Sequence, residues 1–239
     1  MSTINVNNIL AAYSPQGVVN LNGTNVSYNT DGTVIGIGLG ALQICTGNNS
    51  VALGRQALST VTTGGDNTGI GGGALGSTTG SDNTAIGFFA GATHTTGSNN
   101  TFVGHSALGS STTANNEITL GNSANSVLRC AVTTITSLSD ARDKKEVTEL
   151  RTGLDFVNTL KPVEFVWDDR EKSGKHNIAD FGFIAQELKS AQEEVGMADI
   201  LKLVYEGNPE KLEASYGKLI PILVKAIQDL SKEVELLKK

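Results

Sequence analysis

The 239-residue sequence contains only two cysteines, Cys45 and Cys130, whose separation matches neither a zinc-ligand spacing nor a disulfide framework. We expect reduced thiols that pack as small apolar side chains. No segment approaches the ~18 consecutive apolar residues of a membrane-spanning helix. The start, "MSTINVNNILAAYSPQG", lacks the basic and continuous apolar regions of a secretion signal. These absences predict no metal, no cofactor, no membrane insertion, and folding in a cytoplasm.

Charge is also scarce in the first 138 residues, which carry 2 basic and 4 acidic side chains, a net charge of −2. Residues 139–239 hold the other 16 basic and 20 acidic groups, a net charge of −4. Glycine is divided the other way, with 22 of 28 in the first part. The shift predicts two parts with different folds. Neither part is basic enough to bind phosphates non-specifically, so we expect no nucleic-acid partner.

A repeat runs through the glycine-rich part. The pattern G-x-x-A recurs with spacings of 16, 17, 16, 17 and 17 residues, at Gly38, Gly54, Gly71, Gly87, Gly104 and Gly121. The β-prone runs "NNSVAL", "DNTGI", "DNTAI", "NNTFV" and "NNEITL" precede five of these glycines. Each repeat therefore combines a polar turn, a short strand, a glycine and a connection rich in Ser, Thr and Gly, which is typical of stacked β repeats.

One such repeat offers about two or three apolar side chains, too few to offset the backbone entropy of ~16 ordered residues. Stacking buries these side chains in a continuous column. Because large residues are few and small residues suit close approach between chains, we expect several copies to wind together, each supplying one wall of a shared core. The Asn-Asn, Asp-Asn and Gly-Gly pairs suit turns with positive φ.

From Thr33 to Ala124 this arrangement resembles the trimeric β-roll and triple-stranded β-helix stalks of phage fibres and trimeric autotransporter adhesins. The resemblance implies a mainly β, homotrimeric stalk over residues 33–138. Residues 1–32 precede the periodic register, and "INVNNIL" and "GVVNLNGTNVSY" predict short strands there. We expect residues 1–32 to be the attachment segment.

The repeats offer no convincing enzyme site. Glycan-cleaving spikes need two carboxylates that flank one bond. Asp66 and Asp82 occupy the turn position that Asn99 occupies in the next repeat, which indicates turn formers. His94 and His105 have no partners with metal-ligand spacing. We therefore expect no glycan-cleaving activity from this part.

Past Ser139 the sequence predicts an α+β domain. The segment "RTGLDFVNTLK" predicts a short helix with Thr152 as its N-cap, ended by Pro162. "VEFVW" alternates as a strand, "DDREKSGKHN" predicts an exposed loop that includes His176, and "DFGFIAQEL" runs from strand into helix.

The C-terminus carries a heptad seam. Its apolar residues fall at spacings of 4 and 3, at Tyr216, Ile220, Leu223, Ile227, Leu230, Val234 and Leu237. The seam predicts a coiled-coil helix over about 219–239, starting near Leu219 because Pro221 is tolerated only in the first turn. Ile or Val at heptad position a with Leu at position d favours a two-stranded coiled coil, whereas the β repeat favours three chains. We expect three chains, because the repeat is the longer element.

Four motifs in order, "SDARDKKEV", "LKPVEFVWDD", "DFGFIAQEL" and "YGKLIPILVKAIQDLSKEVELL", resemble the intramolecular chaperone domain of phage tail fibres and tailspikes. This is the self-cleaving peptidase family S74, shared with endosialidases and a membrane-bound myelin transcription factor. The resemblance covers about Ser139 to Lys239. It implies a domain that trimerises, drives folding of the preceding β-stalk, and then cuts itself off with a serine–lysine dyad.

For this sequence, the resemblance implies that the nucleophile is Ser139, the base is Lys144, and the scissile bond is Leu138–Ser139. Asp140 and Arg142 match the motif and are expected to fix the turn. Asp143 and Lys145 flank the lysine, so Lys145 stays an alternative base. A serine needs a base to take its proton, and an amine is a base only when burial or neighbouring cations lower its pKa. On one helix, residues five apart diverge by about 140°, so the segment must bend, or the lysine must come from another chain.

These features predict a homotrimeric phage tail fibre or spike protein of the virion, folded in the host cytoplasm. The expected partners are other copies of the chain, other virion proteins through residues 1–32, and a glycan or protein of the host surface. Alternatives are a bacterial trimeric surface adhesin with the same repeats, against which the missing secretion signal counts, and a virion protein that retains its chaperone uncut.

Overall fold

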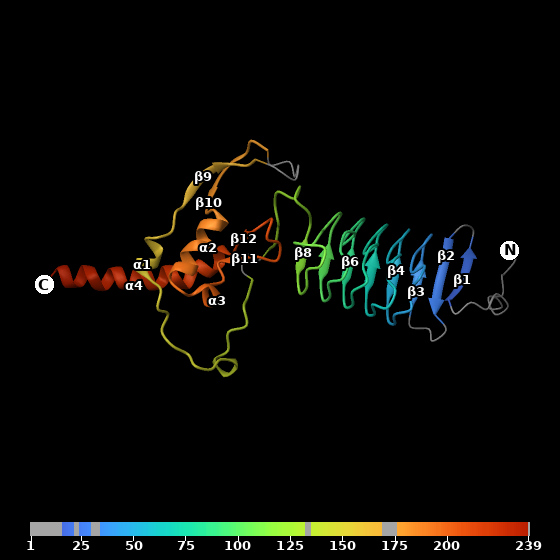
Figure 1. The fold of residues 1–239 in the computed structure, drawn as a ribbon, viewed down its shortest axis with the longest axis horizontal. Coiled ribbons are helices and arrows are strands. Elements are labelled where there is room, and N and C mark those ends of the chain that lie inside the picture. Colours follow the sequence, from blue (N-terminus) through green and yellow to red (C-terminus); the bar gives the residue numbers. More distant parts are fainter. Residues whose placement is uncertain (1–15, 22–23, 30–33, 132–134, 169–175, 239) are drawn as a thin grey trace. The chain divides into compact units, whose positions relative to one another are not determined.

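The computed structural model describes residues 16–21, 24–29, 34–131, 135–168 and 176–238. The chain divides into two compact units, Met1–Asn125 and Ser126–Lys239. The strands of the first unit are drawn in blue to green in Figure 1, and the helices of the second in yellow to red. No helix within the described ranges is long and apolar enough to span a membrane. The finer division into residues 1–32, 33–138 and 139–239 stays a prediction.

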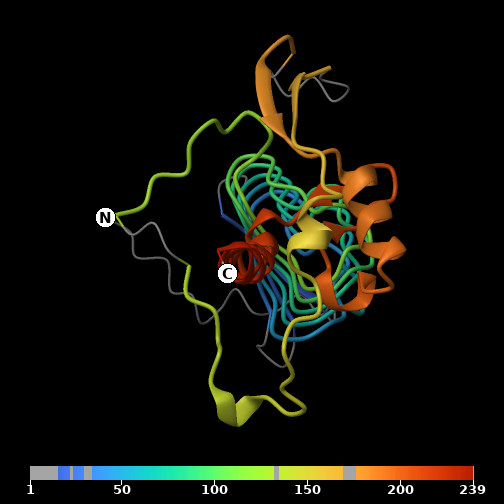
Figure 2. The same cartoon turned by 90° about the vertical axis from the view of Figure 1, so that its left-hand side faces the viewer.

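The first unit is one sheet whose eight strands follow one another in chain order. The strands are β1 (Gln16–Leu21), β2 (Thr24–Asn29), β3 (Ile35–Ile37), β4 (Val51–Leu53), β5 (Thr68–Ile70), β6 (Thr84–Ile86), β7 (Thr101–Val103) and β8 (Ile118–Leu120). β1, β2 and β3 pair antiparallel, and β3 to β8 pair parallel and in register. The chain thus winds a β-solenoid, whose coils are seen nearly end-on in Figure 2. The strands predicted in "GVVNLNGTNVSY" are confirmed, while "INVNNIL" lies outside the described residues.

Each coil fills its own interior. The middle residue of the strand points inward and is fully buried, as at Ala52, Ala85 and Phe102. The Ala-Leu pair after the glycine, such as Ala74 and Leu75, is buried beside it. The expectation that several copies must share this column is therefore wrong: the coil is narrow enough for Ala and Leu of one chain to fill it. The described strands form a β-solenoid, while the trimeric form of the stalk stays a prediction.

The turns of the solenoid use the polar pairs as predicted. One residue of each pair adopts a left-handed backbone conformation with φ between 55° and 62°. It is the first residue at Asp66, Asp82 and Asn99, and the second at Asn49 and Asn116. Asparagine and aspartate tolerate this conformation better than other residues with a side chain. Asp66 and Asp82 are thus turn residues at equivalent positions of successive coils.

The second residue of the pair forms a buried ladder that the sequence reading did not identify. Asn67, Asn83 and Asn100 are buried in successive coils. The Asn83 N–H donates to Asn67 Oδ1 at 3.0 Å, and the Asn100 N–H donates to Asn83 Oδ1 at 3.1 Å. The amide Nδ2 of Asn83 donates to the Gly97 carbonyl at 3.0 Å. These amides satisfy backbone groups inside the solenoid that no water reaches.

The second unit is an α+β fold, as predicted. Its elements are η2 (Ala141–Asp143), α1 (Leu154–Val157), β9 (Val163–Val166), β10 (Ala179–Gly182), α2 (Ala185–Glu194), α3 (Ala198–Leu201), β11 (Val204–Tyr205), β12 (Glu213–Ala214), η3 (Tyr216–Lys218) and α4 (Leu219–Leu237). β9 pairs with β10, and β11 with β12, both antiparallel. The core gathers apolar side chains from the helices and loops, including Phe156, Leu188, Leu203 and Ile222. The predicted strand-to-helix segment, the helix start at Leu219 and the exposed His176 are confirmed.

The helix predicted in "RTGLDFVNTLK" is shorter than expected, and its cap is different. α1 starts after Gly153, and the buried Thr152 Oγ1 has no hydrogen-bond partner among the described residues. The Leu154 N–H is bonded instead by the carboxylate of Asp229, from α4. The Thr152 cap is therefore wrong, because α4 packs so closely that its own carboxylate satisfies the helix start.

Candidate functional site

A short 3-10 turn shapes the segment that begins at Ser139. Asp140 caps this turn: its Oδ1 accepts the Arg142 N–H at 2.8 Å. The Asp143 N–H donates to the Asp140 carbonyl, and the Lys144 N–H donates to the Ala141 carbonyl at 3.2 Å. The backbone therefore bends within five residues, which is one of the arrangements expected for a serine and a lysine at this spacing.

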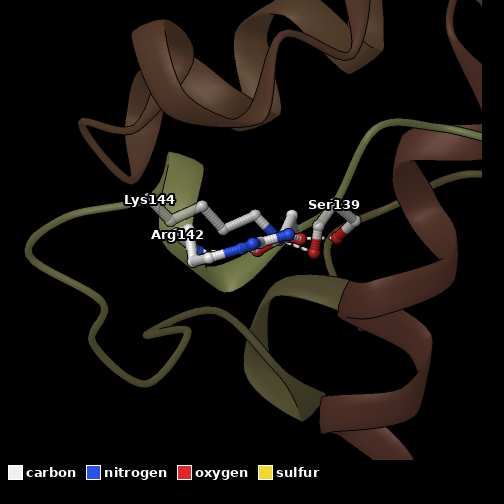
Figure 3. A network of polar contacts seen from close by, with 4 residues as sticks. Ser139, Arg142 and Lys144 are labelled. Carbon is white, nitrogen blue, oxygen red and sulfur yellow. Dashed lines mark hydrogen bonds and ion pairs between the residues drawn. The ribbon is translucent and has the colours of Figure 1, made fainter.

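The bend brings Ser139 and Lys144 of the same chain together (Figure 3). Lys144 Nζ donates to Ser139 Oγ at 2.5 Å and to the Ser139 carbonyl at 3.1 Å. Both residues are exposed, and the Leu138 side chain on the other side of the predicted scissile bond is fully exposed. Lys145, the alternative base, makes no side-chain hydrogen bond or ion pair with the described part of the chain. The geometry allows proton transfer between the Ser139 hydroxyl and the Lys144 amine, while their catalytic roles stay a prediction.

Asp140 and Arg142 form a bidentate ion pair beside this contact. Arg142 Nε and Nη2 lie 3.0 and 2.7 Å from the two Asp140 carboxylate oxygens. The Arg142 side-chain hydrogen bonds lower the pKa of Asp140, and the Asp140 carboxylate raises the pKa of Arg142. The positive charge of Arg142 is therefore matched locally by a carboxylate. Its contribution to the site is to hold the turn rather than to supply an unpaired cation.

The heptad seam of the C-terminal helix lies on the open side of α4. Its six residues have exposed fractions between 41% and 87%: Ile220, Leu223, Ile227, Leu230, Val234 and Leu237. The adjacent side of α4, whose residues Leu219, Ile222 and Ala226 each stand one position before a seam residue, is buried. Two faces of one helix are thus apolar, and the fold of the single chain uses only one of them.

The other sequence candidates lie apart from this site. His94 is buried in the solenoid beside Phe102, and Asn100 Nδ2 lies 3.1 Å from His94 Nε2. His105 stacks on Phe88 with ring centroids 5.7 Å apart. Within the described ranges no group of three or more His, Cys, Asp or Glu side chains is arranged to hold a metal ion. The asparagine ladder could have been found from the sequence, because its members stand one position after each turn former.

Taken together, the chain combines a β-solenoid with an α+β unit that contains a serine–lysine contact. Residues 139–197 match the family model described as chaperone of endosialidase, peptidase family S74. The matched segment begins at Ser139 and ends before α4. Comparisons with curated proteins and with solved structures found no match. The family match supports a chaperone domain in this part of the chain and fits an intramolecular chaperone role.

Proposed function

We propose that residues 139–239 are an intramolecular chaperone that assembles three copies of the chain and then releases itself by cutting the Leu138–Ser139 bond. By analogy with the phage proteins that the sequence resembles, the assembled product is a homotrimeric β-solenoid stalk of a tail fibre or spike. This stalk is displayed on the virion and used for host-surface adhesion. The single observation that carries the proposal is the family match that begins at the Ser139–Lys144 contact.

The exposed seam of α4 supports self-association. Six aliphatic side chains at heptad spacing cost free energy in water, at about 25 cal/mol per Å² of apolar surface, and this cost is removed when equivalent helices pack against one another. A helix of this length is marginal alone, so partner helices stabilise it. A domain that associates first raises the local concentration of the three stalks and fixes their register at one end. This lowers the entropic barrier to assembling the long repeat.

The cleavage chemistry follows from the position of the nucleophile. Ser139 supplies both the attacking oxygen and the leaving nitrogen of the Leu138–Ser139 bond. Its Oγ attacks the Leu138 carbonyl carbon, and the Lys144 amine takes the hydroxyl proton. When the C–N bond breaks, that proton goes to the departing Ser139 nitrogen, and Leu138 is left as an ester on Ser139 Oγ. Water then hydrolyses the ester, which leaves a Leu138 carboxylate and restores the Ser139 hydroxyl.

Release of the chaperone makes the assembled stalk persistent. The stalk cannot return to the separated chains by reversing its assembly path once the domain that guided it has gone. Its survival then depends on an unfolding rate rather than on an equilibrium. An uncut chain would keep the chaperone as part of the mature particle.

Intact mass spectrometry of the expressed full chain tests the cleavage. We expect two products that meet at Leu138 and Ser139, and an uncut chain for Ser139→Ala. Lys144→Met should also remain uncut, whereas Lys145→Met, a matched change of the neighbouring lysine, should be cut like the parent. Cutting that requires Lys145 instead of Lys144 would overturn the assigned base, and cutting of the Ser139→Ala chain would overturn the dyad.

Trimer assembly and host-surface adhesion are tested by separate measurements. Light scattering during size-exclusion chromatography should give the mass of three chains, cut or uncut. A glycan array probed with the assembled protein tests host-surface adhesion. A monomer would contradict the chaperone role, whereas a trimer that binds no glycan or host protein would leave a structural stalk.

A further inference from the structure

The outward face of the solenoid sheet carries no charge. In each three-residue strand from β3 to β8 the first and third side chains point away from the coil interior. We call these twelve residues the outer sheet face: Ile35, Ile37, Val51, Leu53, Thr68, Ile70, Thr84, Ile86, Thr101, Val103, Ile118 and Leu120. Nine are aliphatic and three are threonine. The third-position residues alone form a column with exposed fractions between 36% and 59%.

The third-position column is exposed at every coil, while the first-position residues Val51, Thr68, Thr84 and Thr101 are partly covered. The core is filled by the inward strand position and by the Ala-Leu pairs, so the outward residues are not needed to close the coil. The described charged residues of the solenoid lie elsewhere: Arg55 follows a glycine corner, Asp66 and Asp82 are in turns, and Glu117 bonds Ser110. Soluble monomers rarely expose a continuous apolar surface of this kind, and those that do use it for binding.

The exposed aromatic residues of the solenoid, unlike the outer sheet face, are packed against residues of their own chain. Phe88 and Phe89 contact each other, with ring centroids 4.3 Å apart, and Phe88 also stacks on His105. A Cβ added at Gly72 would lie 3.2 Å from the Phe88 ring, and one added at Gly73 would lie 2.5 Å from the Phe89 ring. These rings therefore pack over two glycines of the preceding coil and have partners within their own chain.

We propose that the outer sheet face is the surface through which the stalks of different copies pack, each coil level against the same level of its neighbours. The inference rests on the proposed trimer. It identifies the outer sheet face as the surface that lies at the threefold axis of the stalk. An uncharged face offers no complement to a charged ligand or partner. Another copy presents the same aliphatic columns with the same spacing between coils, so equivalent side chains meet at every level.

Cysteine cross-linking of the full chain tests this packing. In a Cys130→Ser background, where the remaining Cys45 is buried, Ile70→Cys and Ile86→Cys place thiols in the aliphatic column. Thr62→Cys places one on an exposed position outside the face and is the matched control. With a short bis-maleimide we expect cross-linked chains from Ile70→Cys and Ile86→Cys, and loss of that product in Thr62→Cys.

A charge variant keeps the test decisive if a cysteine perturbs folding. Ile70→Lys with Ile86→Lys leaves the inward core unchanged and should abolish cross-linking through Val103→Cys, while Thr62→Lys should not. A trimer by light scattering that cross-links through Thr62→Cys and not through Ile70→Cys would overturn the inference and leave the proposed chaperone function standing. A monomeric parent chain would overturn the proposed function, and this inference with it.

Discussion

Gly153 lies so close to Asp229 that any side chain at its place must displace the Asp229 carboxylate. A Cβ added at Gly153 would stand 2.1 Å from Asp229 Oδ2 and 2.9 Å from Lys225 Cγ. The same Asp229 carboxylate binds the Leu154 N–H at the start of α1 and the ammonium of Lys225. The start of α1 is therefore fastened to α4, the helix that carries the exposed seam.

Gly153→Ala should destabilise the second unit by about 1–3 kcal/mol, because the added methyl group must push α1 away from α4. All described helices lie in this unit, so urea unfolding followed by helical circular dichroism measures the change in the free energy of unfolding. Gly217→Ala is the matched control, since a Cβ there meets nothing within 4 Å. Equal stability of the two variants would show that α1 is not held in this position.

Acid should weaken the same contact. The Lys225 hydrogen bond is the largest cause that lowers the pKa of Asp229 below its ordinary value of 3.8. A carboxylate whose pKa is lower in the folded than in the unfolded chain stabilises the fold fully above the unfolded value. This stabilisation is lost as the pH falls from about the ordinary value through the folded one. Urea unfolding at a series of acidic pH values should therefore show falling stability, with a smaller fall in Asp229→Asn and in Lys225→Gln. An unchanged acid slope in both variants would exclude the pair as its source.

The buried asparagine ladder gives a prediction for the solenoid. Asn83→Ala removes the acceptor of the Asn100 N–H and the donor to the Gly97 carbonyl, both inside the coil. Leaving these two groups unpaired should cost about 2–6 kcal/mol, since each buried unsatisfied group costs about 1–3 kcal/mol. Asn48→Ala, at an exposed position, is the control. Thermal unfolding monitored in the β region of the circular dichroism spectrum should separate the two, and equal midpoints would mean that water or neighbouring groups replace the Asn83 amide.

Local signals in the sequence predicted much of this structure. The recurrence of glycine and of the polar pairs marks every coil from β3 to β8, because left-handed turns accept few residue types. Pro221 and the heptad located the start of α4, because proline is tolerated only in the first turn of a helix. The relation between Ser139 and Lys144 needed the family resemblance to be noticed, since five residues on a regular helix would not meet.

The missed features depend on close tertiary packing. A column made of Ala and Leu looked too thin to be a core, because the sequence does not give the width of a coil. The capping of α1 by Asp229 joins residues far apart in the chain, whereas Thr152 is the nearer candidate by sequence.

The exposed seam of α4 allows assembly to be separated from folding. Leu230→Glu places a charge in the middle of the seam, on a residue whose exposed fraction is 48%, while the buried side of α4 keeps Ile222 and Ala226. Coiled-coil packing does not tolerate a ring of identical charges at a d position, so we expect loss of the trimer. The helical circular dichroism signal of the second unit should remain close to that of the parent. Gln228→Glu, which introduces the same charge on α4 at an exposed position outside the seam, is the control and should stay trimeric. Light scattering that gives three chains for Leu230→Glu would show that α4 does not hold the copies together.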